Sequence, residues 1–182
     1  MDDARAGTDA GADALALSAV RAALDAAVVR LETAGARDEA LAEFIPRHRR
    51  LLVNREATLR PIGRVWRLGV LLLDRDRVLR ATGSITRATE PGRPAYQSLS
   101  AETRRAYRAA AARGHFAPGE TVNWDAPVIE LQPDALARSA GPLTLSGGRM
   151  LVRWSASSPA TVPFEQYLTE RVDLLTEPPA GA

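Results

Sequence analysis

The sequence predicts an α+β protein: an antiparallel sheet of about five strands, built on two hairpins, with helices from both termini packed on one face. Near both ends of the chain, apolar residues recur at steps of three or four, as in amphipathic helices. In the middle they recur at every second residue, as in half-buried strands. The dipeptide Gly147-Gly148 between two short apolar runs is the signature of a tight hairpin.

The N-terminal part of the chain predicts a tail followed by two helices. Residues 1–12 are mainly Asp, Ala, Gly and Thr, so we expect a disordered tail there. A helix is expected from about Asp13 to Ala34, because Gly35 is a natural stop. Its apolar face comprises Leu17, Val20, Leu24, Val28 and Leu31. A shorter helix is expected over Asp38–Phe44, ending before Pro46.

The segments Arg64–Leu73 and Val78–Thr86 flank a polar turn and predict the first hairpin. One register sorts the side chains so that apolar residues and glycine share a face. Its pairs are Leu72 with Leu79, Val70 with Ala81, Leu68 with Gly83 and Trp66 with Ile85. Because a slip of one residue would destroy this sorting, the sequence favours this register.

Two further helices are expected in the second half of the chain. Ser100 is the expected N-cap of a surface helix that is rich in arginine and ends at Gly114. A last helix starts at Pro163. Its apolar face comprises Phe164, Tyr167, Leu168, Val172 and Leu175.

The remaining strands complete the expected sheet. Thr121–Trp124 and Val128–Leu131 are expected as strands broken at Pro127. The segments Leu143–Ser146 and Arg149–Trp154 form the second hairpin around the glycine pair. We therefore expect one α+β domain over residues 13–176 and a short C-terminal tail over residues 177–182.

One tryptophan lies on each of three expected strands: Trp66, Trp124 and Trp154. The favoured interpretation is that all three fill the core between sheet and helices. The alternative is a small pocket with aromatic walls.

The composition excludes several kinds of chemistry. All 24 basic side chains are arginine, and the chain has no cysteine. Schiff-base lysines, thiolate nucleophiles and thiolate metal sites are therefore ruled out. The only two histidines are His48 and His115, so we expect no metal site and no cofactor. No apolar run approaches the length of a membrane span and no secretory signal opens the chain, so we expect no membrane partner and a cytoplasmic location.

Charge is distributed unevenly along the chain. Residues 1–45 carry a net charge of −5, residues 46–115 carry +11 and residues 116–182 carry −4. A basic middle segment suggests nucleic-acid binding through residues 46–115. The same distribution is expected if acidic terminal helices pack beside a basic sheet.

His115 is the strongest candidate for catalysis, with Asp125 as its acidic partner in a small hydrolase or isomerase. His115 follows the expected end of a helix, so capping the exposed carbonyls is the favoured alternative. His48 lies in the run Arg47-His48-Arg49-Arg50, which is interpreted as a solvated turn. No nucleophile accompanies either histidine.

The second face of the expected sheet carries the candidate ligand-binding residues. Arg67, Arg80 and Arg153 point away from the apolar set, and Ser84 shares their face. Arginine and hydroxyl groups together suit a carboxylate or a phosphate. A solvent-facing sheet whose arginines pair with acids is the structural alternative. The leading hypothesis is a non-catalytic module that binds a small anionic ligand or a protein partner there; nucleic acid comes second, and the sequence does not indicate an oligomeric state.

Three segments carry a resemblance to a known group of proteins: Arg60–Leu72, Val152-Arg153-Trp154-Ser155 and the last helix. Over residues 57–175 the chain resembles a group of small uncharacterised actinobacterial proteins, some labelled glutaminase. The resemblance covers segments that bear the fold. Serine-dependent glutaminases need a Ser-x-x-Lys dyad and the amidotransferase type needs a cysteine, so the residues of this chain speak against that label.

Overall fold

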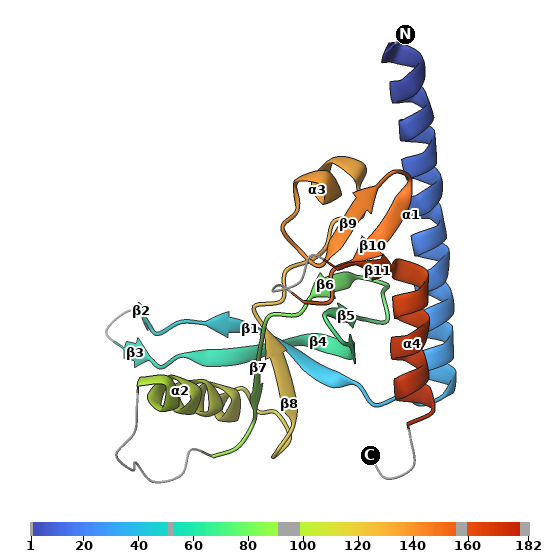
Figure 1. Ribbon diagram of the computed structural model, residues 1–182. Helices are drawn as coiled ribbons and strands as arrows, with labels where there is room; N and C mark the ends of the chain where they lie inside the picture. Colours follow the sequence, from blue (N-terminus) through green and yellow to red (C-terminus); the bar gives the residue numbers. More distant parts are fainter. Residues whose placement is uncertain (1, 51–52, 91–98, 156–159, 179–182) are drawn as a thin grey trace. The chain divides into compact units, whose positions relative to one another are not determined.

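The computed structural model describes residues 2–50, 53–90, 99–155 and 160–178 (Figure 1). Its helices are α1 (Asp2–Thr33), α2 (Leu99–Arg113), α3 (Pro133–Arg138) and α4 (Phe164–Thr176). The strands before α2 are β1 (Glu39–Ile45), β2 (His48–Arg50), β3 (Val53–Arg55), β4 (Thr58–Leu68), β5 (Leu71–Leu73), β6 (Leu79–Ala81) and β7 (Ser84–Arg87). Those after α2 are β8 (Thr121–Trp124), β9 (Leu143–Ser146), β10 (Arg149–Val152) and β11 (Val162–Pro163). The predicted α+β class, with helices at both ends of the chain, is confirmed.

The strands form a larger sheet than expected. Six are hydrogen-bonded in the order β6-β5-β4-β1-β8-β7, and smaller sheets contain β11-β10-β9 and β2-β3. The expectation of a purely antiparallel sheet is wrong, because β1 and β8 pair in parallel. A parallel pair needs a long connection, which in this chain contains several other strands and α2.

The described chain divides into two compact units. Unit 1 comprises residues 1–37, 66–81 and 128–182, and unit 2 comprises residues 38–65 and 82–127. Neither unit is one continuous segment, and β4 contributes residues to both. A single folding domain over residues 13–176 therefore stays a prediction.

The core of unit 1 joins the two terminal helices. The expected faces of α1 and α4 are buried: Leu17, Val20, Leu24, Val28 and Leu31 pack in one cluster with Phe164, Tyr167, Leu168 and Val172. Figure 1 shows α1 and α4 side by side. α1 stops as predicted, because Gly35 has φ +58° and the Ala36 N–H donates to the Leu31 carbonyl at 2.9 Å. The tail expected to be disordered over residues 1–12 is instead helical from Asp2.

The first hairpin differs from its prediction in register. Arg64–Leu73 is not one strand, because the chain turns at Gly69, whose φ is +66°. In consequence β4 pairs with β5, and Leu72 lies opposite Arg80 instead of Leu79. Tertiary contact accounts for the difference: a Cβ at Gly69 would lie 2.1 Å from the Tyr167 hydroxyl, so α4 covers the turn closely.

The second hairpin is confirmed in its turn and register, but β10 ends at Val152 and does not reach the predicted Trp154. Leu145 pairs with Met150 and Leu143 with Val152, as predicted. Both turn glycines have positive φ, +55° at Gly147 and +65° at Gly148. The two-residue turn fixes this register by itself, so the register depends only on local sequence.

Unit 2 contains the largest change from the predictions. Asp38–Phe44, expected as a helix, is largely strand β1, which is hydrogen-bonded to β4 and β8. Ala40, Leu41 and Ala42 are all buried, so both faces of this strand are covered and the alternating pattern of a half-buried strand is absent. β2 and β3 pair as a short hairpin where a turn was expected around His48.

α2 packs on the sheet of unit 2 over a second apolar cluster. This cluster contains Ala40, Ala42, Leu59, Ala88, Ala110, Ala111, Val122 and Trp124. α2 ends at Arg113, before Gly114 as predicted, but it begins at Leu99, so Ser100 lies in its first turn and is not the N-cap.

The three tryptophans differ in how far they are buried. Trp66 is 1% exposed and Trp124 is 7% exposed, whereas Trp154 is 53% exposed, so only two of the three fill the core.

The predicted strand Val128–Leu131 is not a strand in the structure, where Val128 makes an isolated bridge to Arg80. The short helix α3, which follows it, was not predicted.

Candidate functional site between α2 and strand β7

The structure places two of the four predicted ligand-binding residues on one face. Arg67 and Arg80 both pair with Leu72, on β4 and β6 respectively, so the three side chains lie in one row. Leu72 between them is fully buried. Arg153 follows β10 in the three-stranded sheet, and Ser84 belongs to β7 in unit 2. None of the four lines either of two cavities in unit 2, one lined by His115 and one between α2 and β7.

His115 and Asp125 are not brought together. Both are exposed and both have positive φ, +61° and +55°. No hydrogen bond or ion pair within the described residues joins them. Glu120, the acid five residues after His115, already has other partners: it accepts a hydrogen bond from the Ala117 N–H at 3.0 Å and pairs with Arg64 at 2.7 Å.

His115 instead shares a cavity with His48, although the two are far apart in sequence. The cavity has a volume of about 740 Å³, and its other charged residues are Arg55, Arg60, Arg113 and Glu56. Most of its polar groups already have partners. His48 Nδ1 lies 3.1 Å from the Pro46 carbonyl, and Arg113 donates to the Ala57 carbonyl at 2.8 Å. Glu56 pairs with Arg47 at 3.4 Å, so no free carboxylate faces the histidines as a base partner.

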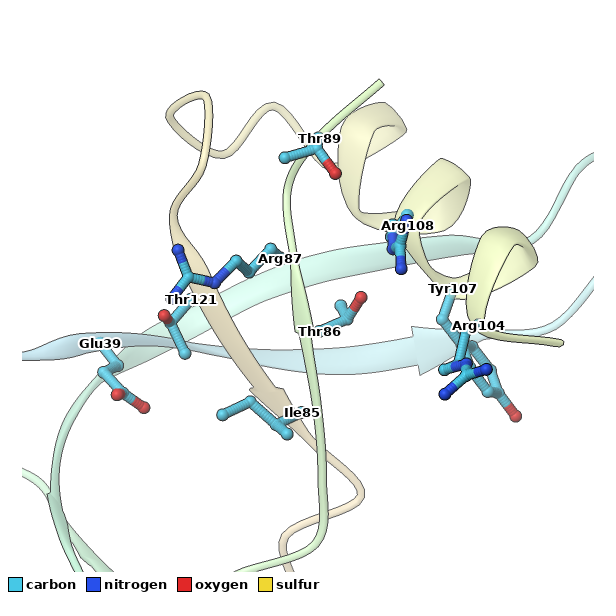
Figure 2. A pocket seen from close by; sticks show the side chains of 9 residues that line it. All are labelled: Glu39, Ile85, Thr86, Arg87, Thr89, Arg104, Tyr107, Arg108 and Thr121. Carbon is cyan, nitrogen blue, oxygen red and sulfur yellow. The ribbon is translucent and has the colours of Figure 1, made fainter. Parts of the chain in front are cut away.

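A second cavity, of about 600 Å³, lies between α2 and β7, and we call it the α2–β7 cavity (Figure 2). Three arginines and three threonines are among its lining residues. The full set is Glu39, Ile85, Thr86, Arg87, Thr89, Arg104, Tyr107, Arg108 and Thr121. Such a lining, with several guanidinium and hydroxyl donors and one carboxylate, suits an anion.

Strand β7 divides this lining into two sides. Thr86 pairs with Val122, whose side chain belongs to the cluster under α2. Ile85 and Arg87 alternate with Thr86, so they point to the other face. Figure 2 shows the same division, with Arg104, Tyr107 and Arg108 on one side of β7 and Ile85, Arg87, Thr121 and Glu39 on the other.

Arg104 and Arg108 are the basic groups on the α2 side. They are four residues apart on one helix, which places their Cβ atoms about 5–6 Å apart on one face. Both are exposed, and neither has an ion pair or hydrogen bond within the described residues. Like charges at this spacing destabilise a helix by a few tenths of a kcal/mol. The charges of this pair therefore do not stabilise the helix, and both side chains are available to a ligand.

Arg64 shows the opposite arrangement. It donates to Asp38 and to Glu120, each at 2.7 Å. The side-chain hydrogen bond with Glu120 raises the pKa of Arg64, with a further contribution from Asp38. Arg64 is thus neutralised by two acids and has a structural role, which distinguishes it from Arg104 and Arg108.

Tyr107 forms the aromatic base of the α2 side. Its ring lies 4.4 Å from that of Trp124 and 5.7 Å from that of Phe44. The ring is thereby fixed against the core, while its hydroxyl has no hydrogen-bond partner among the described residues. The hydroxyls of Thr86 and Thr89 are unpartnered in the same sense. Three neutral donors thus accompany the two arginines.

The described lining of the cavity contains one acid, Glu39, which lies on the far side of β7. Glu39 accepts a hydrogen bond from the buried amide of Asn123 at 2.7 Å. This bond holds the carboxylate on that face (Figure 2). Among the described lining residues, the α2 side therefore contains only cationic and neutral side chains.

The sequence contains a signal for this site, although the predicted binding residues did not include it. Neither Arg104 nor Arg108 has an acidic residue three or four positions away, so neither can form the usual pair along the helix. The sequence could not show that Thr86 and Arg87 lie in the same site as these two arginines, because it does not reveal that β7 packs beside α2.

Within the described residues, no cluster of three or more His, Asp or Glu side chains could hold a metal ion. No helix in this part of the chain is long and apolar enough to cross a membrane. Comparison with protein-family models, with curated proteins and with solved structures finds no match for this chain. The resemblance to small actinobacterial proteins therefore stays a prediction.

Proposed function

We propose that this protein is a binding module for an anionic ligand, and that the α2–β7 cavity is its binding site. The observation that carries the proposal is the pair Arg104 and Arg108, two like charges one helical turn apart with no counter-charge among the described residues. The proposal keeps the class of ligand expected from the sequence and moves its site from Arg67, Arg80 and Arg153 to α2 and β7.

The chemistry of the lining supports binding in preference to proton transfer. Arginine stays charged at any pH of interest, and threonine and tyrosine hydroxyls stay protonated near neutrality. Guanidinium groups recognise carboxylate and phosphate oxygens through paired N–H donors. Hydroxyls of Thr86, Thr89 and Tyr107 can donate to the remaining oxygens.

The test is calorimetric titration with inorganic phosphate, pyrophosphate and glutamate. We expect Arg104→Ala together with Arg108→Ala to weaken the binding of at least one probe by about tenfold or more, since each charged hydrogen bond contributes about 1.5 kcal/mol or more. The matched control is Arg49→Ala with Arg105→Ala. It also removes two unpaired charges from unit 2, but neither residue lines the cavity. Equal losses in the two double variants would mean that only net charge attracts the anion, and would overturn the proposal.

Nucleic-acid binding is the second candidate, because the net positive charge of the chain lies in unit 2. Unit 2 contains twelve arginines and eight acidic residues, a net charge of +4, whereas unit 1 has a net charge of −2. A nucleic acid would contact phosphates over a broad surface, so the affinity of a labelled single-stranded oligonucleotide should fall steeply with salt. The two double variants should then weaken it equally, which separates this candidate from the first.

A further inference from the structure

Strand β7 is the last of the six hydrogen-bonded strands, so one of its edges has no neighbouring strand among the described residues. An open edge presents unpaired backbone N–H and C=O groups and is a template for another strand. β7 contains no proline, and its four residues are Ser84, Ile85, Thr86 and Arg87. Every residue of this strand therefore has a backbone N–H, and none interrupts an added strand in the way that a proline would.

The hydrogen bonds at the end of β7 show which groups face outward. The Ala88 N–H donates to the Glu120 carbonyl at 2.9 Å, toward β8. Because inward and outward groups alternate in an antiparallel pair, Thr86 also faces β8, and Ile85 and Arg87 face the open edge. The Arg87 carbonyl accepts from the Thr89 N–H at 2.9 Å. The open groups are thus the N–H and C=O of Ile85 and the N–H of Arg87, none of which has a partner outside the β7–β8 ladder among the described residues.

The cavity lies on both sides of this same edge. One side carries Arg104, Arg108 and Tyr107, and the other carries Ile85, Arg87 and Thr121 (Figure 2). Side chains of an extended peptide alternate between the two faces of the sheet that it joins. A peptide added to β7 would therefore place every second side chain against the arginines of α2 and the others beside Ile85, which is 55% exposed.

We propose that β7 accepts an extended acidic peptide of a partner protein as an additional strand, with its carboxylates on the α2 side and apolar side chains beside Ile85. This inference rests on the proposed function, since Arg104 and Arg108 supply the anion recognition. A small anion would leave the outward groups of Ile85 to solvent, whereas an added strand hydrogen-bonds with them and meets the arginines at the same time. A second copy of this chain is disfavoured at this edge, because it would bring its own Arg87, Arg104 and Arg108 to an edge that is already basic.

The test uses a fluorescein-labelled peptide of ten residues that alternates valine and glutamate, titrated by fluorescence anisotropy. Two derivatives carry backbone N-methyl groups, on all valines in one and on all glutamates in the other. Only one set of amides faces β7 in an added strand. We expect one derivative to bind at least about tenfold more weakly than the parent peptide and the other to keep most of its affinity, because loss of each backbone hydrogen bond weakens binding about fivefold.

Variants of β7 give an independent reading. Ile85→Pro removes the outward N–H without removing a bond to β8, as proline is tolerated on sheet edges. It should weaken the parent peptide about fivefold or more, whereas Ile85→Val should have little effect. Circular dichroism checks that Ile85→Pro is folded. If it is not, the pair of N-methylated peptides still decides.

The outcomes separate this inference from the proposed function. If both N-methylated peptides bind as well as the parent, and all three depend on Arg104 and Arg108, strand addition is overturned while anion binding stands. Binding of phosphate or glutamate without binding of any peptide leads to the same conclusion. If no anionic probe binds, both proposals fall.

Discussion

The hydroxyl of Tyr167 gives the sharpest test of the fold. Tyr167 lies on α4 and is 3% exposed. Its oxygen accepts from the Val70 N–H at 2.9 Å and donates to the Leu68 carbonyl at 3.2 Å. Both groups flank Gly69, the residue at which β4 turns back into β5. Tyr167→Phe removes this oxygen and leaves the shape of the ring unchanged.

The expected cost follows from the groups left without partners. The Val70 N–H has no other partner in the described structure, while a carbonyl such as that of Leu68 has a second lone pair to use. We therefore expect a loss of about 1–2 kcal/mol in the free energy of unfolding. For a protein of this size that corresponds to a fall of about 3–6 °C in Tm.

Urea unfolding followed by tryptophan fluorescence measures this effect, with Tyr107→Phe as the control. The Tyr107 hydroxyl has no partner among the described residues, so its removal should change stability by less than about 0.5 kcal/mol. If the two substitutions cost the same, the hydroxyl of Tyr167 does not hold the Gly69 turn and our account of the β4–β5 register is wrong.

Three further predictions concern packing, backbone conformation and ion pairing. Leu31→Ala, at a fully buried position of α1, should destabilise the protein by about 2–5 kcal/mol, measured by the same urea unfolding. Gly148→Ala should cost more than Gly147→Ala in thermal unfolding: both have positive φ, but only at Gly148 would the new Cβ meet a neighbour, Ala12 Cβ at 2.7 Å. Arg64→Met should cost about 1 kcal/mol or less in low salt, because the Arg64 side chain is 44% exposed and solvent screens both of its ion pairs; a cost that did not shrink in 1 M salt would contradict the ion-pair interpretation.

The sequence was sufficient to predict the apolar faces of the terminal helices and the turn and register of the second hairpin. The apolar faces of α1 and α4 depend on a period of 3.6 residues, and the turn at Gly147-Gly148 depends on a local backbone preference. Each of these signals lies within a few residues, so distant parts of the chain do not alter it. α1 starts at Asp2, whereas the prediction placed its start at Asp13, because the composition of residues 1–12 gave no reason to extend the helix into this segment.

Pairing between distant segments decided the rest. β1 became a strand because β4 and β8 flank it on both edges, and its local pattern of alanine and leucine equally favoured a helix. The turn at Gly69 could not be anticipated, because the Tyr167 side chain that holds it comes from α4, nearly a hundred residues later. The same holds for the candidate site. The sequence determined which residues carry positive charge, but only the packing of α2 beside β7 placed Arg104 and Arg108 at an open sheet edge, since residues far apart in sequence meet only in the folded chain.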